Sequence, residues 1–314
     1  MPSVDNGGTP PPVIFLVGPT GAGKSALAVE LALRRNGEIV SADSRLLYRG
    51  FDIGTDKPSP AVRTRVPHHL IDVTDADQPW SLAEYKTAAQ ECISQIRARN
   101  RLPLLVGGTG QYIFALVEGW DIPPVAPTPE LRLRLEERVA AEGLAFLTAE
   151  LAELDPAAAA KIDPRNARRV IRALEVVLST GKPFSAQRTR GEIAFQPFLI
   201  GLNRPRPELY SLADARIDRM FHAGWVEEVR ALLDKGYSSR LPAFSALGYG
   251  PIVRHLRGEL TLAECVVEIR RATRVLIRHQ ANWFRPDDPQ IHWLSAGPDV
   301  GDQADQLIRQ NAIG

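Results

Sequence analysis

A glycine-rich segment near the start of the chain has the residue types of a phosphate-binding loop. Residues 18–25 read GPTGAGKS, which matches the pattern G-x-x-x-x-G-K-[ST]. The segment follows the apolar run VIFLV at 13–17 and leads into SALAVELAL at 25–33. These flanks predict a buried strand, a turn and a helix, which is the context that such a loop requires. We therefore expect a ligand with two or more linked phosphates to bind here.

Each residue type in this loop has a physical reason. Glycines let backbone N–H groups approach phosphate oxygens closely, and the following helix presents its positive end. Lys24 supplies a point charge, and the Ser25 hydroxyl can hold a magnesium ion. The predicted phosphate-binding residues are Gly18, Pro19, Thr20, Gly21, Ala22, Gly23, Lys24 and Ser25. The loop alone does not choose between hydrolysis, phosphoryl transfer and displacement of a diphosphate.

Two further predicted strands end in residues that could take part in chemistry at the same edge of a sheet. A strand at 38–42 is followed by Asp43, and a strand at 102–106 runs into the second glycine-rich turn, GGTG at 107–110. Ligands of open α/β sheets bind at the carboxyl ends of the strands, so Asp43 and Ser25 should face one crevice. Asp43 could hold a metal or accept a proton, or it could cap a helical stretch predicted at 45–48. Thr109 could contact a substrate or complete a tight turn.

Other candidate residues have ordinary structural interpretations that compete with functional ones. Asp72, in a strand candidate at 70–73, could assist a metal in a nucleotide-hydrolysing site, but a role as a turn residue at the end of a strand is favoured. His68 and His69 are adjacent on a predicted strand, so their side chains point to opposite faces and cannot share one metal.

Positive charge is concentrated in two stretches. Between residues 161 and 190 there are eight basic residues and two acidic ones, and a second basic stripe occupies 270–285. Both could follow a nucleic-acid backbone, although a single stretch of this kind is usually a solvated helix face. Arg216 and Arg219 lie one helical turn apart and could grip an anion, or they could be ordinary surface arginines.

The order of predicted elements indicates an α/β protein with a P-loop NTPase-like parallel sheet flanked by helices and a mostly helical insertion. Strands and helices alternate over the first 120 residues, including a helix at 81–99. A strand at 197–202 returns the chain to the sheet, before helices at 208–221, 226–235 and 259–284 and an edge strand at 291–294. The predicted domains are a flexible lead-in at 1–10, a core at 11–120 and 196–314, and a helical insertion at 121–195 that contains the first basic stretch. The insertion begins with a Pro-rich connector at 121–127 and a helix capped by Thr128.

Composition narrows the class of protein. The chain has 314 residues, of which 44% are hydrophobic and 24% charged, so it can build an ordinary globular core. The net charge of +1 neither requires nor excludes a nucleic-acid partner. Cys92 and Cys265 are too few for a disulfide framework and too far apart for a metal motif. Without an apolar run of membrane-spanning length, we expect a cytoplasmic protein with no membrane partner.

Several separate motifs together resemble the bacterial tRNA dimethylallyltransferases, also called tRNA isopentenyltransferases. The matching segments are GPTGAGKS at 18–25, SADS at 41–44, DIGTDKP at 52–58, GGTG at 107–110, RALEV at 172–176, GY at 248–249 and QANWFR at 280–285. The resemblance implies transfer of a dimethylallyl group from dimethylallyl diphosphate to the exocyclic amine (N6) of the adenosine 3′-adjacent to the anticodon in a tRNA anticodon stem-loop. No phosphoryl group would move, and we expect a monomer.

The resemblance also implies roles for individual residues. Asp43 would be the general base, and the loop would hold the diphosphate leaving group with help from Thr20, Ser25 and Mg²⁺. Arg219 would complete the diphosphate grip, and the adenine would be flipped out of the anticodon loop to reach the donor. The implied tRNA-binding residues are Asp43, Ser44, Arg45, Leu46, Thr109, Arg132, Arg168, Arg169, Arg172, Gly248 and Tyr249.

Two segments depart from the family pattern at positions implied to contact tRNA. The chain has Asn166-Ala167-Arg168-Arg169 where the family usually has Asp-Pro-Gln-Arg, so that Arg168 replaces a glutamine. Gly250 and Pro251 stand where a basic and a polar residue are expected after Gly248-Tyr249.

Three other functions share some of these features. A P-loop kinase of a small hydroxyl compound would bind ATP in the loop and use Asp43 as its base. A nucleotide-switched binding module would not turn over, but the chain lacks the Asn-Lys-x-Asp motif that reads guanine. A prenyltransferase that acts on free adenosine phosphates would have no evident need for the two basic stretches.

Overall fold

The computed structural model describes residues 12–122, 129–187 and 190–311. The chain divides into two compact units. The core unit contains the chain up to residue 80, residues 84–117 and residues from 193 onward, and the helical unit contains 81–83 and 118–192. The lead-in expected at 1–10, most of the expected connector at 121–127 and the predicted cap Thr128 lie outside the described residues.

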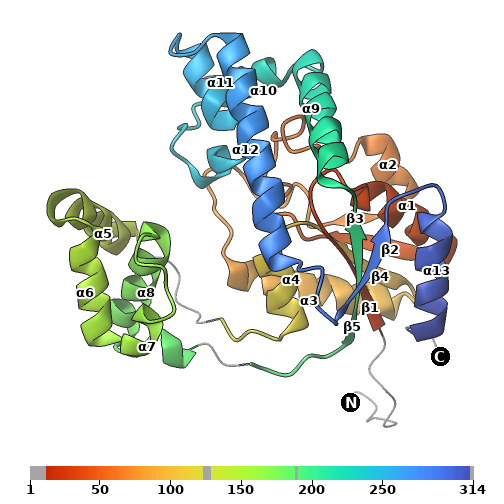
Figure 1. Cartoon of the computed structure of the whole chain (residues 1–314), viewed down its shortest axis with the longest axis horizontal. Helices are drawn as coiled ribbons and strands as arrows, with labels where there is room; N and C mark the ends of the chain where they lie inside the picture. Colours follow the sequence, from red (N-terminus) through yellow and green to blue (C-terminus); the bar gives the residue numbers. More distant parts are fainter. Residues whose placement is uncertain (1–11, 123–128, 188–189, 312–314) are drawn as a thin grey trace. The chain divides into compact units, whose positions relative to one another are not determined.

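Six strands form one sheet in the core unit, in the order β3-β2-β4-β1-β5-β6 (Figure 1). Every neighbouring pair is parallel. The strands are β1 (Pro12–Val17), β2 (Gly37–Ser41), β3 (His68–His69), β4 (Leu102–Val106), β5 (Gln196–Asn203) and β6 (Ile291–Ser295). The central strands are short apolar runs because a parallel sheet is covered on both faces. The predicted α/β fold is confirmed.

Helices cover both faces of this sheet (Figure 1). On one face, α1 (Lys24–Arg35) and α13 (Val300–Asn311) pack on side chains that include Ile14, Leu16 and Ile200. On the other lie α3 (Leu82–Ala98) and α4 (Gly110–Val117). There the Tyr85 hydroxyl donates to the Ser41 carbonyl oxygen at 3.1 Å, and the Tyr85 ring stacks on Tyr112. This contact fixes the end of β2, where Asp43 follows.

A second hydrophobic cluster joins the C-terminal helices to the loop after β2. The helices are α9 (Arg206–His222), α10 (Trp225–Asp234), α11 (Tyr249–Leu256) and α12 (Leu262–Trp283), with the short helix η2 (Pro242–Ser245) between α10 and α11; α2 (Pro60–Arg65) lies outside the cluster. Trp225 and Tyr249 pack there with Phe51 from the loop. The helix expected from 259 begins at 262, because Thr261 and Glu264 form a reciprocal capping box.

The helical unit contains α5 (Pro129–Glu142), α6 (Leu144–Leu154), α7 (Pro156–Ala159), α8 (Ala167–Thr180) and the short helix η1 (Ser185–Gln187). Its own core includes Leu135, Leu147, Leu151, Val170 and Leu174. The side chain of Asn166 caps α8 by accepting from the Arg169 N–H at 3.2 Å. As predicted, the described residues between 129 and 187 form helices joined by turns and contain no strand.

The structure corrects two local predictions and adds one helix that was not predicted. The third strand is His68–His69, not 70–73, because Leu70 and Asp72 adopt positive φ angles of 58° and end the strand. α1 is capped at its C-terminal end by Asn36, which takes the left-handed conformation. Residues 44–47 form turns instead of a helical stretch. The sequence after Ala296 gave no prediction, yet it forms α13, whose residues Ala304 and Ile308 are buried. None of the described helices is long and apolar enough to cross a membrane.

Candidate active site

The phosphate loop connects β1 to α1 at the carboxyl edge of the sheet. Its glycines at 18, 21 and 23 all have positive φ angles, of 131°, 85° and 101°. A Cβ atom on Gly18 would lie 2.3 Å from the carbonyl oxygen of Leu202 on β5. Both the conformation and the lack of space therefore require glycine at position 18. The tight turn carries the chain directly into α1, which starts at Lys24.

Lys24 is the positive group at the centre of this loop. Its ammonium group donates to the carbonyl oxygen of Pro19 at 2.9 Å. Burial lowers the pKa of Lys24 to about 8; the nearby carboxylate of Asp43 acts in the opposite direction, and the nearby guanidinium of Arg216 lowers the pKa further. Asp43 and Arg216 thus both lie within electrostatic reach of Lys24. A bound anion would restore the charge that burial disfavours.

Arg216 reaches this site from α9. Its Nη1 donates to Asp56 at 3.3 Å, and its Nε is buried with no hydrogen-bond partner among the described residues. A buried donor without an acceptor is costly unless a ligand supplies one, and a phosphate oxygen is a suitable acceptor. Arg219, one turn further along α9, is exposed. Of the two arginines, Arg216 is therefore the one that the structure brings to Lys24, and the role of Arg219 stays a prediction.

Asp43 follows β2 and faces the same edge of the sheet. One of its carboxylate oxygens accepts from the Arg45 N–H at 2.9 Å, which makes a local turn in place of the predicted helix cap. The Thr109 hydroxyl accepts from the Ser44 N–H at 3.2 Å, and the Thr109 N–H donates to the Ala42 carbonyl oxygen at 3.3 Å. The second glycine turn therefore holds the backbone on both sides of Asp43.

The neighbours of Asp43 that were predicted to contact tRNA are placed by the same turn. Ser44, Arg45 and Leu46 are all half-buried. The Arg45 guanidinium donates to the carbonyl oxygen of Pro242 at 3.2 Å. Arg45 therefore links the turn after β2 to the C-terminal helical cluster.

The last turn of α12 contacts both glycine-rich segments. The side-chain oxygen of Gln280 accepts from the Thr20 N–H at 2.8 Å, and its amide nitrogen donates to the Gly108 carbonyl oxygen at 3.3 Å. A Cβ atom on Gly110 would lie 2.2 Å from the Trp283 ring. Reasoning from the sequence assigned Gln280 no role, since a glutamine on a helix carries no sign of its distant partners.

The loop at 52–57 is held by Glu228 on α10. The Glu228 carboxylate accepts from the N–H groups of Asp52 and Ile53 at 2.8 and 2.6 Å, and from the Tyr249 hydroxyl at 2.7 Å. Burial, assisted by the Glu228 carboxylate, raises the pKa of Tyr249. Tyr249 is 0% exposed, so this predicted tRNA-binding residue lies in the packed interior. Its role toward tRNA stays a prediction.

Close packing around Trp225 requires two glycines in this region. A Cβ atom on Gly54 or Gly248 would lie 2.0 or 2.1 Å from atoms of the Trp225 ring. Gly248 also has a φ angle of 96°, which favours glycine. Its place at the start of α11 is thus explained by packing, and a contact with tRNA stays a prediction. Gly250, one of the departures from the family pattern, is exposed.

Asp72 has a structural role, as the sequence favoured. It pairs with Lys57 and Arg63, each at 2.6 Å, and Lys57 also donates to the Tyr48 carbonyl oxygen. Although partial burial acts in the other direction, hydrogen bonds from Lys57 and Arg63 lower the pKa of Asp72. These contacts hold together the segment between Tyr48 and Asp72.

No metal site built from side chains is found in the part of the chain that the structure describes, where no group of three or more His, Cys, Asp and Glu residues could hold an ion. His69 instead pairs with Glu38 at 2.6 Å. Ser25 is exposed in the first turn of α1. A magnesium ion at Ser25 would therefore take its other ligands from phosphate oxygens and water, which suits an ion that keeps several waters.

In the helical unit, the basic residues divide into two groups. Arg132 donates to the buried carboxylate of Glu175 through Nε at 2.9 Å and through Nη2 at 2.7 Å, and Arg172 lies 3.6 Å from the same carboxylate. Arg168 and Arg169 are exposed at the start of α8. Arg132 thus holds α5 to α8, whereas Arg168 and Arg169 are accessible to a partner.

The fold and the site define a P-loop α/β protein. A family model described as IPP transferase matches residues 46–287. A tRNA dimethylallyltransferase of Chloroflexus aurantiacus is 55% identical over 293 residues, which cover 90% of this chain and 99% of the relative. One from Roseiflexus sp. is 48% identical over 299 residues, with 95% and 98% covered. The crystal structure of the tRNA isopentenylpyrophosphate transferase of Bacillus halodurans is similar, with a TM-score of 0.70, 35% identity and 95% of each chain covered.

The chain belongs to the IPP transferase family. The resemblance found from the motifs is therefore confirmed, and so is the prediction that the chain is a transferase. The roles of individual site residues stay predictions.

Proposed function

We propose that this chain transfers a dimethylallyl group from dimethylallyl diphosphate to the N6 amine of the adenosine 3′-adjacent to the anticodon of tRNA, with release of diphosphate. The observation that carries the proposal is the grouping of Lys24 and Arg216 with Asp43 at one edge of the sheet. Two cations can bind a leaving diphosphate there, while a carboxylate beside them accepts a proton. Membership of the IPP transferase family favours carbon transfer over phosphoryl transfer.

The donor side binds and stabilises the diphosphate. Lys24, Arg216 and the N–H groups of the loop neutralise the charge that develops as the carbon–oxygen bond breaks. Arg216 is held toward this position by Asp56, and its Nε, which has no hydrogen-bond partner within the described ranges, can donate to the diphosphate. Thr20 and Arg219 are proposed to assist. Ser25 would hold Mg²⁺, which when bound neutralises further charge on the diphosphate.

The acceptor side provides the base. As the N6 nitrogen attacks the allylic carbon, a carbon–nitrogen bond forms, the carbon–oxygen bond to diphosphate breaks, and Asp43 takes the proton from nitrogen. One Asp43 oxygen already accepts from the Arg45 N–H, which orients the carboxylate. A stacked adenine cannot reach a donor at a sheet edge, so the base must be flipped out of the anticodon loop.

We assign the contacts with tRNA to residues of both units. Near Asp43 the proposed contacts are Ser44, Arg45, Leu46 and Thr109, and in the C-terminal helices they are Gly248 and Tyr249. In the helical unit, the exposed pair Arg168 and Arg169 is proposed to contact phosphates, with Arg172 and Arg132 beside them. We place this activity in the cytoplasm and expect a monomer.

The test is transfer of label from labelled dimethylallyl diphosphate to unmodified tRNA with adenosine at the position after the anticodon. Label on the RNA, lost when that adenosine is replaced by guanosine, supports the proposal. Label on free adenosine phosphates, with tRNA unlabelled, would make the chain a prenyltransferase of nucleotides. Consumption of ATP with a small hydroxyl acceptor, without prenyl transfer, would make it a kinase.

A further inference from the structure

The buried face of α12 contains two polar residues, Thr273 and Gln280, at positions where the spacing predicts apolar ones. The buried residues Cys265, Ile269, Thr273, Ile277 and Gln280 follow one another at helical spacings of three or four. The Thr273 hydroxyl is satisfied within the helix by the Ile269 carbonyl oxygen at 2.9 Å. Gln280 is 7% exposed and carries an amide that must find partners outside its own helix.

Those partners are the two glycine-rich segments, which are otherwise separate in the sequence. The Gln280 amide accepts from the Thr20 N–H in the phosphate loop and donates to the Gly108 carbonyl oxygen in the second turn. The two groups are closely packed, since a Cβ atom on Gly108 would lie 2.2 Å from the Gln280 amide nitrogen. The two segments also lie side by side, since the same Cβ atom would be 3.8 Å from the Gly18 carbonyl oxygen.

The second glycine-rich turn, at 107–110, is also hydrogen-bonded to the backbone around Asp43. Thr109, next to Gly108, pairs with the backbone of Ala42 and Ser44. A continuous series of hydrogen bonds therefore runs from the phosphate loop through Gln280 and Thr109 to the residues that flank Asp43.

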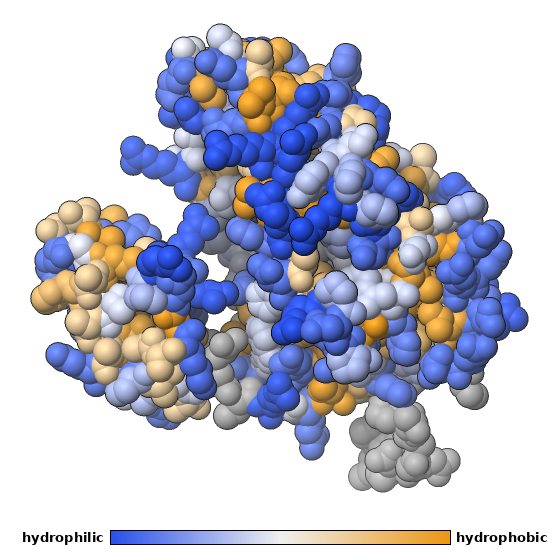
Figure 2. Space-filling model, in the orientation of Figure 1, coloured by the Kyte–Doolittle hydropathy of each residue, from blue (hydrophilic) through white to orange (hydrophobic). Residues whose placement is uncertain are grey.

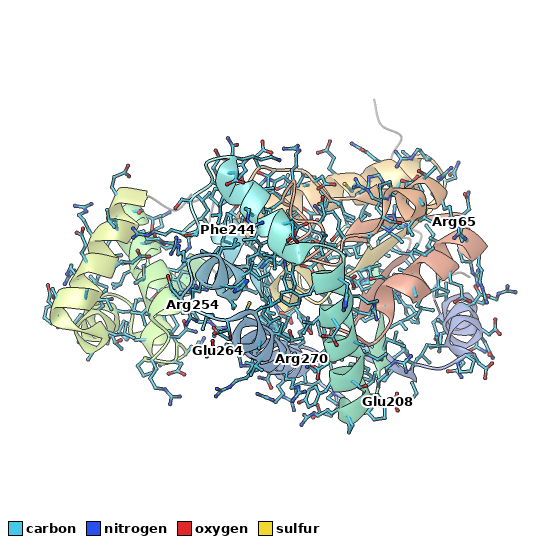
Figure 3. The ribbon with its side chains drawn as sticks, turned by 90° about the horizontal axis from the view of Figure 1, so that it is seen from above. Arg65, Glu208, Phe244, Arg254, Glu264 and Arg270 are labelled. Carbon is cyan, nitrogen blue, oxygen red and sulfur yellow. The ribbon has the colours of Figure 1, made fainter. Side chains whose placement is uncertain are left out.

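α12 itself is fixed to the helix that carries Arg216. Arg270, labelled in Figure 3, pairs with Asp218 of α9 at 2.5 Å, and Arg274 pairs with Asp214 at 2.6 Å. The solvent-facing surface over α9 and α12 is predominantly hydrophilic, as Figure 2 shows. Trp283, one turn beyond Gln280, stacks on Phe114 of α4. Gln280 thus lies on a helix that is bound to both α9 and α4.

We propose that Gln280 is a positioning residue that sets the distance and orientation between the diphosphate site and Asp43. Its two hydrogen bonds join the segment that holds the leaving group to the segment that holds the base. In a displacement reaction, the nucleophile, the carbon and the leaving group must be aligned, and misplacement by about 1 Å can cost about a hundredfold in rate. This inference rests on the proposed function for its catalytic consequence.

The experiment compares the wild type with Gln280→Met, Gln280→Glu and the control Gln303→Met on the exposed face of α13. Methionine keeps the size and flexibility of glutamine but makes neither hydrogen bond. Glutamate keeps an acceptor for the Thr20 N–H but opposes the Gly108 carbonyl oxygen with a second acceptor. Thermal unfolding, kcat, KM for tRNA and the Kd of inorganic diphosphate are measured for each.

We expect Gln280→Met to lower kcat at least tenfold and to raise the Kd of inorganic diphosphate at least threefold, with KM for tRNA within threefold of the wild type. Gln280→Glu should lower kcat further. A purely structural role would instead lower the unfolding temperature and leave kcat per folded molecule unchanged. Values of kcat and diphosphate Kd within twofold of Gln303→Met would overturn the inference.

The two proposals fail in different ways. If the wild type transfers no prenyl group to tRNA, the proposed function is wrong, while the diphosphate Kd of the Gln280 variants still reports whether Gln280 orders the phosphate loop. If the wild type is active and the Gln280 variants match the control, only the role of Gln280 is wrong.

Discussion

From the lowered pKa of Lys24 we predict how the use of dimethylallyl diphosphate depends on pH. Burial lowers the pKa of Lys24 to about 8, so above that pH most molecules of the free enzyme carry a neutral lysine. A diphosphate binds the protonated form more tightly. The value of kcat/KM for dimethylallyl diphosphate should therefore fall as pH rises through 8, by about tenfold at pH 9 relative to its plateau at lower pH.

The pH dependence of kcat should differ from that of kcat/KM. Bound diphosphate favours the charged lysine and raises the pKa of Lys24 in the complex. The fall in kcat at saturating donor and tRNA should therefore begin at a higher pH than the fall in kcat/KM. The separation between the two profiles measures how much the bound anion stabilises the charged lysine.

Two variants identify the titrating group. Lys24→Arg places a guanidinium that stays charged over this range, so its kcat/KM, although reduced, should show no break near pH 8. Arg216→Gln removes a neighbouring positive charge, so the break should move to higher pH. The assay is initial-rate prenyl transfer with limiting donor and saturating tRNA from pH 6.5 to 10. A flat wild-type profile, or a break that persists in Lys24→Arg, would refute the assignment.

Three further predictions follow from other parts of the site. Asp43→Asn should lower kcat by about 10²- to 10⁴-fold while leaving tRNA affinity within threefold, as measured by single-turnover transfer and direct binding. A loss of kcat of threefold or less would mean that Asp43 has only a structural role, in the turn that it forms with Arg45. Arg168→Ala and Arg169→Ala should each weaken tRNA binding, and together they should reduce the slope of log K against log salt by about 1 to 2; an unchanged slope would place the phosphate contacts elsewhere. Glu175→Gln leaves the Arg132 guanidinium beside a neutral partner and should destabilise the helical unit by about 1 to 3 kcal/mol, since Arg132 is partly exposed and the pair is only partly desolvated. Limited proteolysis and thermal unfolding check the last prediction, and equal stability of Glu175→Gln and the wild type would contradict it.

The parts of the site that could be predicted from the sequence are those in which residue type fixes local geometry. The phosphate loop is of this kind, because glycines with positive φ angles, a lysine and a serine at fixed spacing leave little choice of conformation. Asp43 could be placed for a related reason, since the carboxyl ends of parallel strands meet at one edge.

Other features depend on long-range packing and could not be predicted. Arg216 and Arg219 lie on the same helix, and the rotation of α9 about its axis decides which of them faces the site. That rotation is set by the burial of Leu209, Ala213 and Ile217 against the rest of the core unit. The strand expected at 70–73 has the composition of a strand, but Asp72 is drawn into pairs with Lys57 and Arg63. Its favourable contacts outweigh the local preference for extended backbone.

The arrangement of the central strands has a consequence for how the chain folds as it leaves the ribosome. β1 lies between β4 and β5, and its register with β5 pairs Pro12 with Gln196 and Val17 with Gly201. The phosphate loop therefore cannot gain its full set of neighbours until about two hundred residues have been synthesised, and Gln280 arrives later still. The helical unit, in contrast, draws almost all of its residues from one continuous stretch, 118–192. It can fold before the strands on either side of it in the sequence have paired, so the helical unit can be complete before the catalytic edge of the sheet has formed.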